Sequence, residues 1–141
     1  MEAQSLAEAV RECMLTNDAA TRSLGIVIEA IGPGTARAAM TVRADMLNGF
    51  ATCHGGLIAT LADSAFAFAC NSRDAMSVAA GFAIDILRPA QLGDVLLAEC
   101  REQALAGRSG VYDVTVSNQR GEVVALFRGK SHRLGDRKVL E

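Results

Sequence analysis

The chain has 141 residues, half of them hydrophobic and 21% charged, which is enough for one domain with a core of its own. The net charge of −2 and the pI near 5.7 argue against nucleic acid as a partner. No apolar run reaches the roughly 18 residues that a membrane span needs, and the acidic N-terminus has no signal-peptide pattern. We therefore expect a cytoplasmic protein without a membrane partner.

The cysteines and histidines do not form a metal-binding pattern. The four cysteines have no CxxC spacing, and only two histidines are present to join them as ligands. This spacing predicts reduced thiols and no metal site. The residues concerned are Cys13, Cys53, Cys70, Cys100, His54 and His132.

The first third of the chain predicts one helix and a β-hairpin. Residues 4–16 have the apolar spacing of a short amphipathic helix. Residues 24–31 are apolar and rich in β-branched side chains, residues 32–34 read Gly-Pro-Gly, and residues 35–43 alternate between small or apolar and polar side chains. This pattern is typical of two strands joined by a tight turn. The side chains expected on the inner face of the second strand are Ala36, Ala38, Met40 and Val42.

The rest of the chain predicts a loop over 45–54, a helix over about 56–71 and four strands. The helix is apolar nearly all round, as expected of a central buried helix. Short turns separate the last three strands, which favours an antiparallel meander, and residues 135–141 are expected to be frayed. We predict a single α+β domain over residues 1–141, with an antiparallel sheet wrapped around one long central helix. The four strands are expected at 77–87, 94–104, 110–118 and 122–134.

One carboxylate in this apolar helix is the strongest functional signal. Asp63 is the only formally charged side chain between Asp45 and Arg73. A buried carboxylate is costly unless it has a partner, a proton or a catalytic role, and Ala59 and Ala67 offer it no helical ion pair. Asp63 is therefore a candidate nucleophile, or a general base that directs water at a carbonyl. The alternative is a structural carboxylate that binds a neighbouring N–H group or an arginine.

Two glycines open the same helix. The first N–H groups of a helix lack intrahelical partners, and Gly55 and Gly56 have no side chain to keep a ligand away from them. A carbonyl oxygen placed there would be polarised, and a developing oxyanion would be stabilised. The alternative is a tight turn that only leads into a packed helix.

The spacing of these two features predicts a dimer. Eight residues separate Gly55 from Asp63, or about 12 Å along an α-helix at ~1.5 Å per residue. A carbonyl carbon must lie about 3 Å from both the attacking group and the oxyanion donors, which one helix does not easily provide. Two antiparallel helices related by a two-fold axis do provide it, so we expect a homodimer with two shared sites.

Other polar residues around the glycines have open roles. His54 either contacts a substrate carbonyl or bonds to the loop backbone, and Asn48 either orients a water or forms a turn with Gly49. Cys53 beside His54 permits a Cys/His nucleophile, but sequence neighbours seldom face each other and no third group orients them. Near the C-terminus, a basic strand face either meets the phosphates of a nucleotide-like tail or is a solvated edge. Its residues are Arg128, Lys130 and His132.

The segment Asn48-Gly-Phe-Ala-Thr-Cys-His-Gly-Gly56, followed by Leu-Ala-Asp63, resembles the hot-dog-fold acyl-CoA thioesterases. The order of elements fits that fold along nearly the whole chain. The collinear segments Ile-Asp-Ile-Leu-Arg-Pro and Ala-Leu-Phe-Arg-Gly-Lys-Ser-His-Arg are similar to the branch that acts in phenylacetate degradation. The resemblance implies hydrolysis of (hydroxy)phenylacetyl-CoA-type aromatic thioesters to an acid and free CoA. It implies no cofactor, because CoA is part of the substrate, and a homodimer that pairs into a homotetramer.

The resemblance also implies roles for individual residues. Asp63 would be the general base or nucleophile, Gly55 would give the oxyanion N–H, and Asn48 and His54 would position water or the thioester. Gly56 would leave room for the substrate. The candidates for the phosphates of CoA are Arg88, Lys130 and Arg133.

The chain departs from the family at one position. Some relatives carry a serine on the strand after the long helix that helps to hold water, whereas Ala79 and Ala80 occupy that region here. A hydroxyl, if needed, would have to come from Ser77 or Ser64. Two other functions compete with hydrolysis: a non-catalytic acyl-CoA-binding or regulatory hot-dog module, and a hot-dog dehydratase or hydratase. Asp63 argues against the first, and the Asn-x5-His-Gly-Gly pattern argues against the second.

Overall fold

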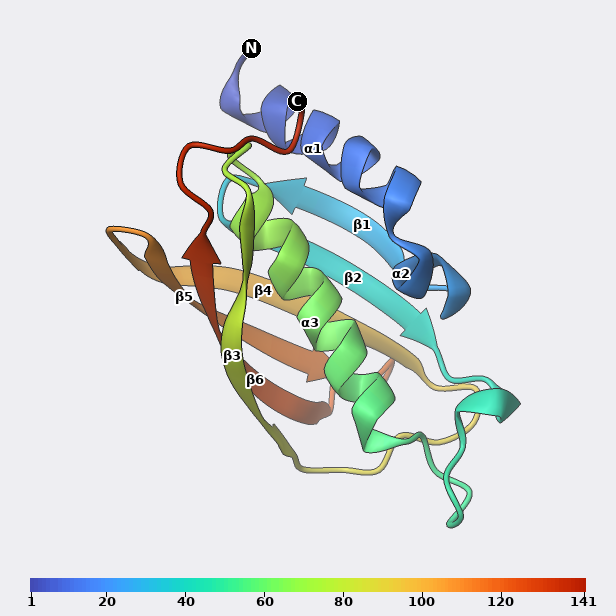
Figure 1. The fold of residues 1–141 in the computed structure, drawn as a ribbon. Coiled ribbons are helices and arrows are strands. Elements are labelled where there is room, and N and C mark those ends of the chain that lie inside the picture. The colour runs from blue at the N-terminus through green and yellow to red at the C-terminus, as the bar shows by residue number, and fades with distance from the viewer.

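The computed structural model describes residues 1–141 as one antiparallel sheet curved around a long helix (Figure 1). The strands follow the order β1-β2-β4-β5-β6-β3, and α3 lies against the concave face of the sheet. The predicted α+β architecture is therefore confirmed. The elements are α1 (Ala3–Asn17), α2 (Ala19–Ser23), β1 (Val27–Gly32), β2 (Thr35–Thr41), the 3-10 turn η1 (Ala44–Met46), α3 (Gly55–Asn71), β3 (Ser77–Ile86), β4 (Val95–Ala106), β5 (Ser109–Ser117) and β6 (Val123–Arg133).

The hairpin and the meander form as the sequence patterns predict. β1 pairs with β2 through a turn in which Gly34 has φ +74°, a conformation that favours glycine. β4, β5 and β6 pair in sequence order. Because alternate side chains of a strand point to opposite faces, every second residue of β2 faces α3. The buried residues on this side are Ala36, Ala38, Met40 and Val42.

The core lies between α3 and the sheet. Phe66 of α3 packs its ring 5.5 Å from that of Tyr112 on β5 and 5.8 Å from that of Phe127 on β6. A Cβ on Gly129 would lie 2.9 Å from the Phe66 ring, so this glycine lets β6 approach the helix closely. Only a narrow stripe of α3 stays partly accessible, and it carries Asp63 among small residues. The other members of the stripe are Gly56, Ala59, Thr60 and Ala67.

β3 is an open edge of the sheet. It runs antiparallel beside α3, pairs only with β6, and leaves eight of its ten residues exposed (Figure 1). Val78, Phe82 and Ile86 keep 46%, 49% and 44% of their surface accessible. A long apolar edge strand invites pairing with another strand.

The structure differs from the sequence expectations in two places. The short helix α2 was not predicted, because its five residues are too few to show an apolar period. The C-terminal tail is not frayed: the carboxylate of Asp74 accepts hydrogen bonds from the N–H groups of Val139 and Leu140 at 2.8 and 2.9 Å. No helix in the structure has both the length and the apolar character needed to span a bilayer.

Candidate functional site

Asp63 lies at the middle of α3, half-buried on its accessible stripe. Its carboxylate accepts no hydrogen bond from the chain and forms no ion pair, so the structural role of binding an N–H group or an arginine is not observed. Burial raises the pKa of Asp63, and the nearby Asp18 carboxylate raises it further. A partly desolvated carboxylate without a partner is a stronger base than an exposed one.

The start of α3 presents free backbone donors. His54 is the N-terminal cap, and its carbonyl oxygen accepts from the N–H groups of Leu57 and Ile58 at 2.9 and 3.3 Å. The N–H groups of Gly55 and Gly56 have no partner within the chain. Nothing lies within 4 Å of a Cβ built on Gly56, so the approach to this end of the helix is open. These two N–H groups are therefore available to an anion or a carbonyl oxygen.

The helix α3 is continuous from Gly55 through Asp63, so the separation expected from the sequence is present in the structure. Gly55 and Asp63 are about 12 Å apart along the axis at ~1.5 Å per residue. A single chain therefore presents the carboxylate and the oxyanion donors as two separate half-sites.

The side-chain oxygen of Asn48 forms hydrogen bonds within its own loop. Its Oδ1 atom accepts hydrogen bonds from the N–H groups of Phe50 and Thr52 and from the hydroxyl of Thr52, at 2.9, 3.2 and 3.2 Å. A bridge between Leu47 and Cys53 closes the loop. The Nδ2 group of Asn48 has no partner in the chain, so only this donor is free to orient water or substrate.

His54 and Cys53 do not form a nucleophilic pair. The Cys53 thiol is buried and contacts the backbone oxygen of His54 at 3.7 Å, whereas the His54 side chain is exposed. Burial raises the pKa of Cys53, which keeps the thiol protonated at neutral pH. The Cys/His alternative is therefore not supported.

The two hydroxyls considered as water ligands are engaged elsewhere. Ser64 is buried and lies 3.1 Å from the hydroxyl of Thr21, and Ser77 donates to the backbone oxygen of Ala75 at 3.0 Å. Ala79 and Ala80 are exposed on β3 and supply no polar atom in their side chains.

The three basic residues suggested for CoA do not lie together in one chain. Arg88 follows the end of β3 and donates to the backbone oxygen of Val123 at 3.0 Å. Arg133 pairs with Ser77 at the other end of β3, about 30 Å away at ~3.3 Å per residue. Lys130 is exposed on the outer face of β6, opposite α3.

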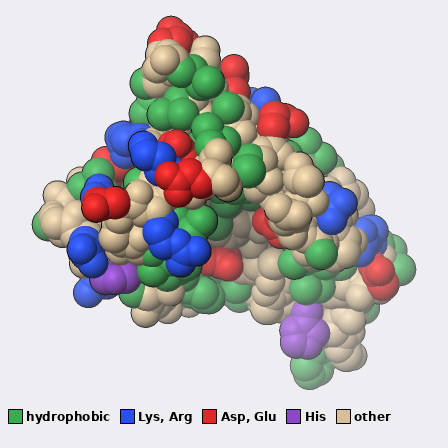
Figure 2. Space-filling view, turned by 45° about the horizontal axis from the view of Figure 1, so that its top comes forward, with side chains coloured by type: hydrophobic (Ala, Val, Ile, Leu, Met, Phe, Trp, Pro, Cys, Tyr) green, Lys and Arg blue, Asp and Glu red, His purple; other side chains and the backbone are tan.

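Arg133 instead lines a cavity of about 230 Å³ near the C-terminal end of α3, with Arg73 and Arg108. Lys and Arg side chains gather at this end of the molecule, which carries the β4–β5 turn (Figure 2). Ser131 also lines the cavity. Sequence reasoning missed Arg73 and Arg108, because neither belongs to a motif.

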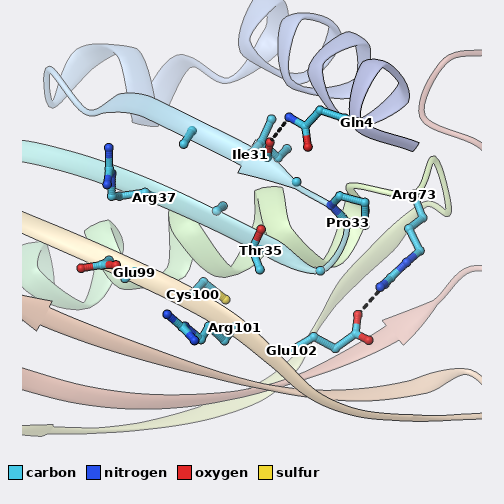
Figure 3. Close-up of a pocket in the computed structure, with 14 residues that line it drawn as sticks. Gln4, Ile31, Pro33, Thr35, Arg37, Arg73, Glu99, Cys100, Arg101 and Glu102 are labelled. Carbon is cyan, nitrogen blue, oxygen red and sulfur yellow. Dashed lines mark hydrogen bonds and ion pairs between the residues drawn. The ribbon is translucent and has the colours of Figure 1, made fainter. Parts of the chain in front are cut away.

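A larger groove of about 570 Å³ lies elsewhere and is not associated with Asp63 or Gly55. It runs along β2 and β4 beside the β1–β2 turn, where Arg37, Glu99 and Arg101 lie on the outer face of the sheet (Figure 3). The strands separate it from α3 (Figure 3). No group of three or more His, Cys, Asp or Glu side chains is placed to hold a metal ion.

Comparison with known proteins gives a consistent result. Residues 50–125 match the thioesterase superfamily. The chain is 49% identical over 122 residues to the acyl-coenzyme A thioesterase PaaI of Escherichia coli K12, covering 86% of this chain and 87% of that protein. The solved structure of E. coli PaaI, from the phenylacetic acid degradation operon, is similar at a TM-score of 0.94 and 45% identity, covering 96% of this chain and 99% of that one. A Streptococcus mutans UA159 protein bound to acetyl-CoA is similar at a TM-score of 0.77 and 29% identity, covering 80% and 91%.

Proposed function

The chain belongs to the thioesterase superfamily and is a thioester hydrolase, and on that premise we propose that it hydrolyses (hydroxy)phenylacetyl-CoA-type thioesters in phenylacetate degradation. The resemblance seen in the sequence segments is confirmed by the similarity to PaaI. The observation that carries the proposal is the unpaired, half-buried carboxylate of Asp63 on a helix whose first N–H groups are free. These are a base and an oxyanion site, the two components that acyl transfer requires.

The chemistry follows from these two groups. The thioester oxygen accepts from the Gly55 N–H, which polarises the carbonyl carbon. Asp63 takes a proton from water as the water oxygen attacks that carbon, and the C–S bond breaks when the tetrahedral intermediate collapses. The CoA sulfur leaves with the electron pair and then takes a proton. In a second form of the reaction, Asp63 attacks the carbonyl carbon first, the C–S bond breaks and the CoA thiolate leaves, and water then hydrolyses the resulting anhydride. Label from isotopic water on Asp63 after one turnover would favour this second form.

The open edge and the two half-sites support a homodimer with shared active sites. Pairing of β3 with β3 of a second copy would satisfy its free backbone groups and cover Val78, Phe82 and Ile86. The small side chains beside Asp63 permit close approach of the second α3. In such a dimer, Asp63 of one chain would face the Gly55 N–H of the other. We extend this to a cytoplasmic homotetramer built from two such dimers.

The apolar side chains beside the site suit an aromatic acyl group. The Phe82 ring stacks on that of Phe127 with centroids 4.8 Å apart, and both face the helix side of the sheet. Ile86 faces the same side, next to Gly55. Phe82 and Ile86 remain half-exposed, so they offer an apolar wall to a phenyl ring held between the helices.

The arginine-lined cavity is the best position for the phosphates of CoA. Cys70, which lines it, is seven residues beyond Asp63, or about 10 Å along α3 at ~1.5 Å per residue. Arg108 forms no ion pair within the chain and supplies charge-assisted donors there, whereas Arg73 pairs with Glu102 and Arg133 with Asp136. Arg88 and Lys130 are less suitable because Arg88 lies at the other end of β3 and Lys130 lies on the outer face.

The test is release of free thiol from a panel of arylacetyl-, benzoyl- and straight-chain acyl-CoA thioesters. We expect fastest release with the arylacetyl group, and a loss of about 10²–10⁴ in kcat for Asp63→Ala. Glu8→Ala is the control, because Glu8 is exposed on α1, far from the start of α3 and from the arginine-lined cavity. No thiol from any thioester would overturn hydrolysis, and binding of acyl-CoA without hydrolysis would favour the regulatory module. Equal rates in Asp63→Ala would overturn the role of Asp63.

A further inference from the structure

A hydrogen-bonded chain connects the start of α2 to α3 directly beside Asp63. Asp18 caps α2: its Oδ1 accepts from the N–H of Thr21 at 3.0 Å, and its Oδ2 accepts from the Thr21 hydroxyl at 2.7 Å. The Thr21 hydroxyl also lies 3.1 Å from that of Ser64. Thr21 and Ser64 are 1% and 7% exposed, so this connection is inside the protein. Ser64 is the residue after Asp63, so these contacts hold Asp18 against the turn of α3 that carries Asp63.

The carboxylates of Asp18 and Asp63 differ in the hydrogen bonds that they accept. Asp18 accepts two hydrogen bonds from Thr21, whereas Asp63 accepts none from the chain. Burial raises the pKa of Asp63, and the Asp18 carboxylate raises it further. The arrangement therefore favours proton uptake at Asp63.

No other charge close to Asp63 opposes this effect. On β4 and β5 the helix-facing titratable groups are Cys100 and Tyr112, and burial raises the pKa of both, which keeps them neutral at pH 7. Burial also raises the pKa of Cys70, on α3 itself, to about 12. Other charged groups on the packed elements are paired at a distance or lie on the exposed side. They are exposed Glu8 and the pair Arg11 and Glu12 on α1, Arg22 on α2, Arg73 with Glu102 at the far end of α3, exposed His54 at its start, and Glu29, Arg37, Asp85, Glu99, Arg101, Asp113, Arg128, Lys130, His132 and Arg133 on the strands.

We propose that Asp18 is a positioning residue of the hydrolytic reaction, whose fixed negative charge makes Asp63 a stronger base. When Asp63 takes the proton of the attacking water, its repulsion with Asp18 disappears, so the charge on Asp18 favours the transfer. A general base transfers protons more efficiently when its pKa approaches the working pH. The catalytic part of this inference rests on the proposed function, but the effect on Asp63 exists without substrate.

The substitution Asp18→Asn tests this directly. Asparagine caps a helix about as well as aspartate. Its one side-chain oxygen can still accept from the Thr21 N–H, and its amide group can donate to the Thr21 hydroxyl, so the fold should be retained. Titration of the Asp63 carboxyl, followed by ¹³C NMR without substrate, should move its midpoint to lower pH. The acidic limb of the kcat/KM profile should move the same way, and kcat at its plateau should fall by about 2–10-fold. A midpoint that is unchanged or higher would overturn the inference, even if the protein hydrolyses no thioester.

Two matched variants distinguish the effect of the Asp18 charge from the effect of the net charge of the protein. Asp18→Glu keeps the charge, so its midpoint should stay above that of Asp18→Asn, and equal midpoints would contradict the inference. Glu12→Gln removes a charge from an exposed position on α1 and should leave the midpoint where it is. A shift in Glu12→Gln as large as that in Asp18→Asn would mean that net charge alone is responsible.

Discussion

The Cδ1 atom of Ile86 lies 3.0 Å from the position that a Cβ of residue 55 would occupy, so the end of β3 fixes the start of α3. In Gly55→Ala the methyl group would push against Ile86 and narrow the approach to the free N–H groups. We expect a loss of about 10–1,000-fold in kcat/KM, because a misplaced oxyanion donor loses much of its effect. Steady-state thiol release measures it.

The same contact can be isolated by a double-mutant cycle. Ile86→Val removes Cδ1, so it should relieve the clash in Gly55→Ala. We expect a coupling of about 0.5–1 kcal/mol in the free energy of unfolding between the two changes. If the two changes in the free energy of unfolding, measured by urea denaturation, are strictly additive, residues 55 and 86 are not energetically coupled.

Asp63→Asn should stabilise the protein at neutral pH. Because burial and then Asp18 raise the pKa of Asp63 above its ordinary value of 3.8, the folded state holds more protons than the unfolded state between these two values. The free energy of unfolding therefore falls as pH rises through that window, and the ionised carboxylate lowers stability above it. We expect Tm of Asp63→Asn to exceed that of the wild type at pH 7, with the difference shrinking as pH falls toward 3.8. A lower Tm for the variant at pH 7 would contradict the raised pKa.

Shared sites predict complementation between two inactive chains. In a mixed dimer of Asp63→Ala with Gly55→Val, one site would combine the intact Asp63 with the intact Gly55, and the other site would lack both. An isolated mixed dimer should therefore have about half of the wild-type activity, and an unseparated, randomly paired mixture about one quarter. Each variant is purified with a different affinity tag, and mixed dimers are isolated after co-refolding. Confirmed mixed dimers without activity would place Asp63 and Gly55 of each site on one chain.

The arginine-lined cavity predicts that the KM for acyl-CoA depends on the phosphates of CoA. Arg108→Ala should raise KM by about tenfold, since a charge-assisted hydrogen bond contributes ~1.5 kcal/mol or more. The matched control is Arg101→Ala, which lies in the outer groove. Substrates made with dephospho-CoA or with pantetheine should lose affinity in the wild type and lose less in Arg108→Ala. Equal losses in both proteins would remove Arg108 from the phosphate site.

Local patterns predicted most of the fold and two features of the candidate site. The alternation through Met40 predicted the inner face of β2, and the glycines at 55 and 56 predicted where α3 begins. Asp63 was identified because a lone carboxylate in an apolar helix, without a cation at i±4, is costly unless it has a partner, a proton or a catalytic role. Each of these signals is contained in a few consecutive residues.

The rest of the site depends on contacts between distant segments. Asp18 reaches Asp63 only because Thr21 meets Ser64, 43 positions along the chain. Arg108 meets Arg133 because the N–H of Arg133 donates to the backbone oxygen of Arg108 in the β4–β5 turn at 2.8 Å, and Arg108 belongs to no motif. The anchoring of the tail by Asp74 likewise spans 65 residues. Periodicity carries no information about such pairs.

The position of β3 in the sheet also has a consequence for biosynthesis. Its sole partner is β6, so residues 77–86 cannot be hydrogen-bonded in place until residues 125–133 have been made. Closing so long a loop is entropically unfavourable until β4 and β5 have formed the intervening hairpins. Ile86 can therefore support the start of α3 only near the end of translation. The reaction centre would be assembled last, and a chain truncated before β6 would expose an unpaired, apolar β3 to aggregation.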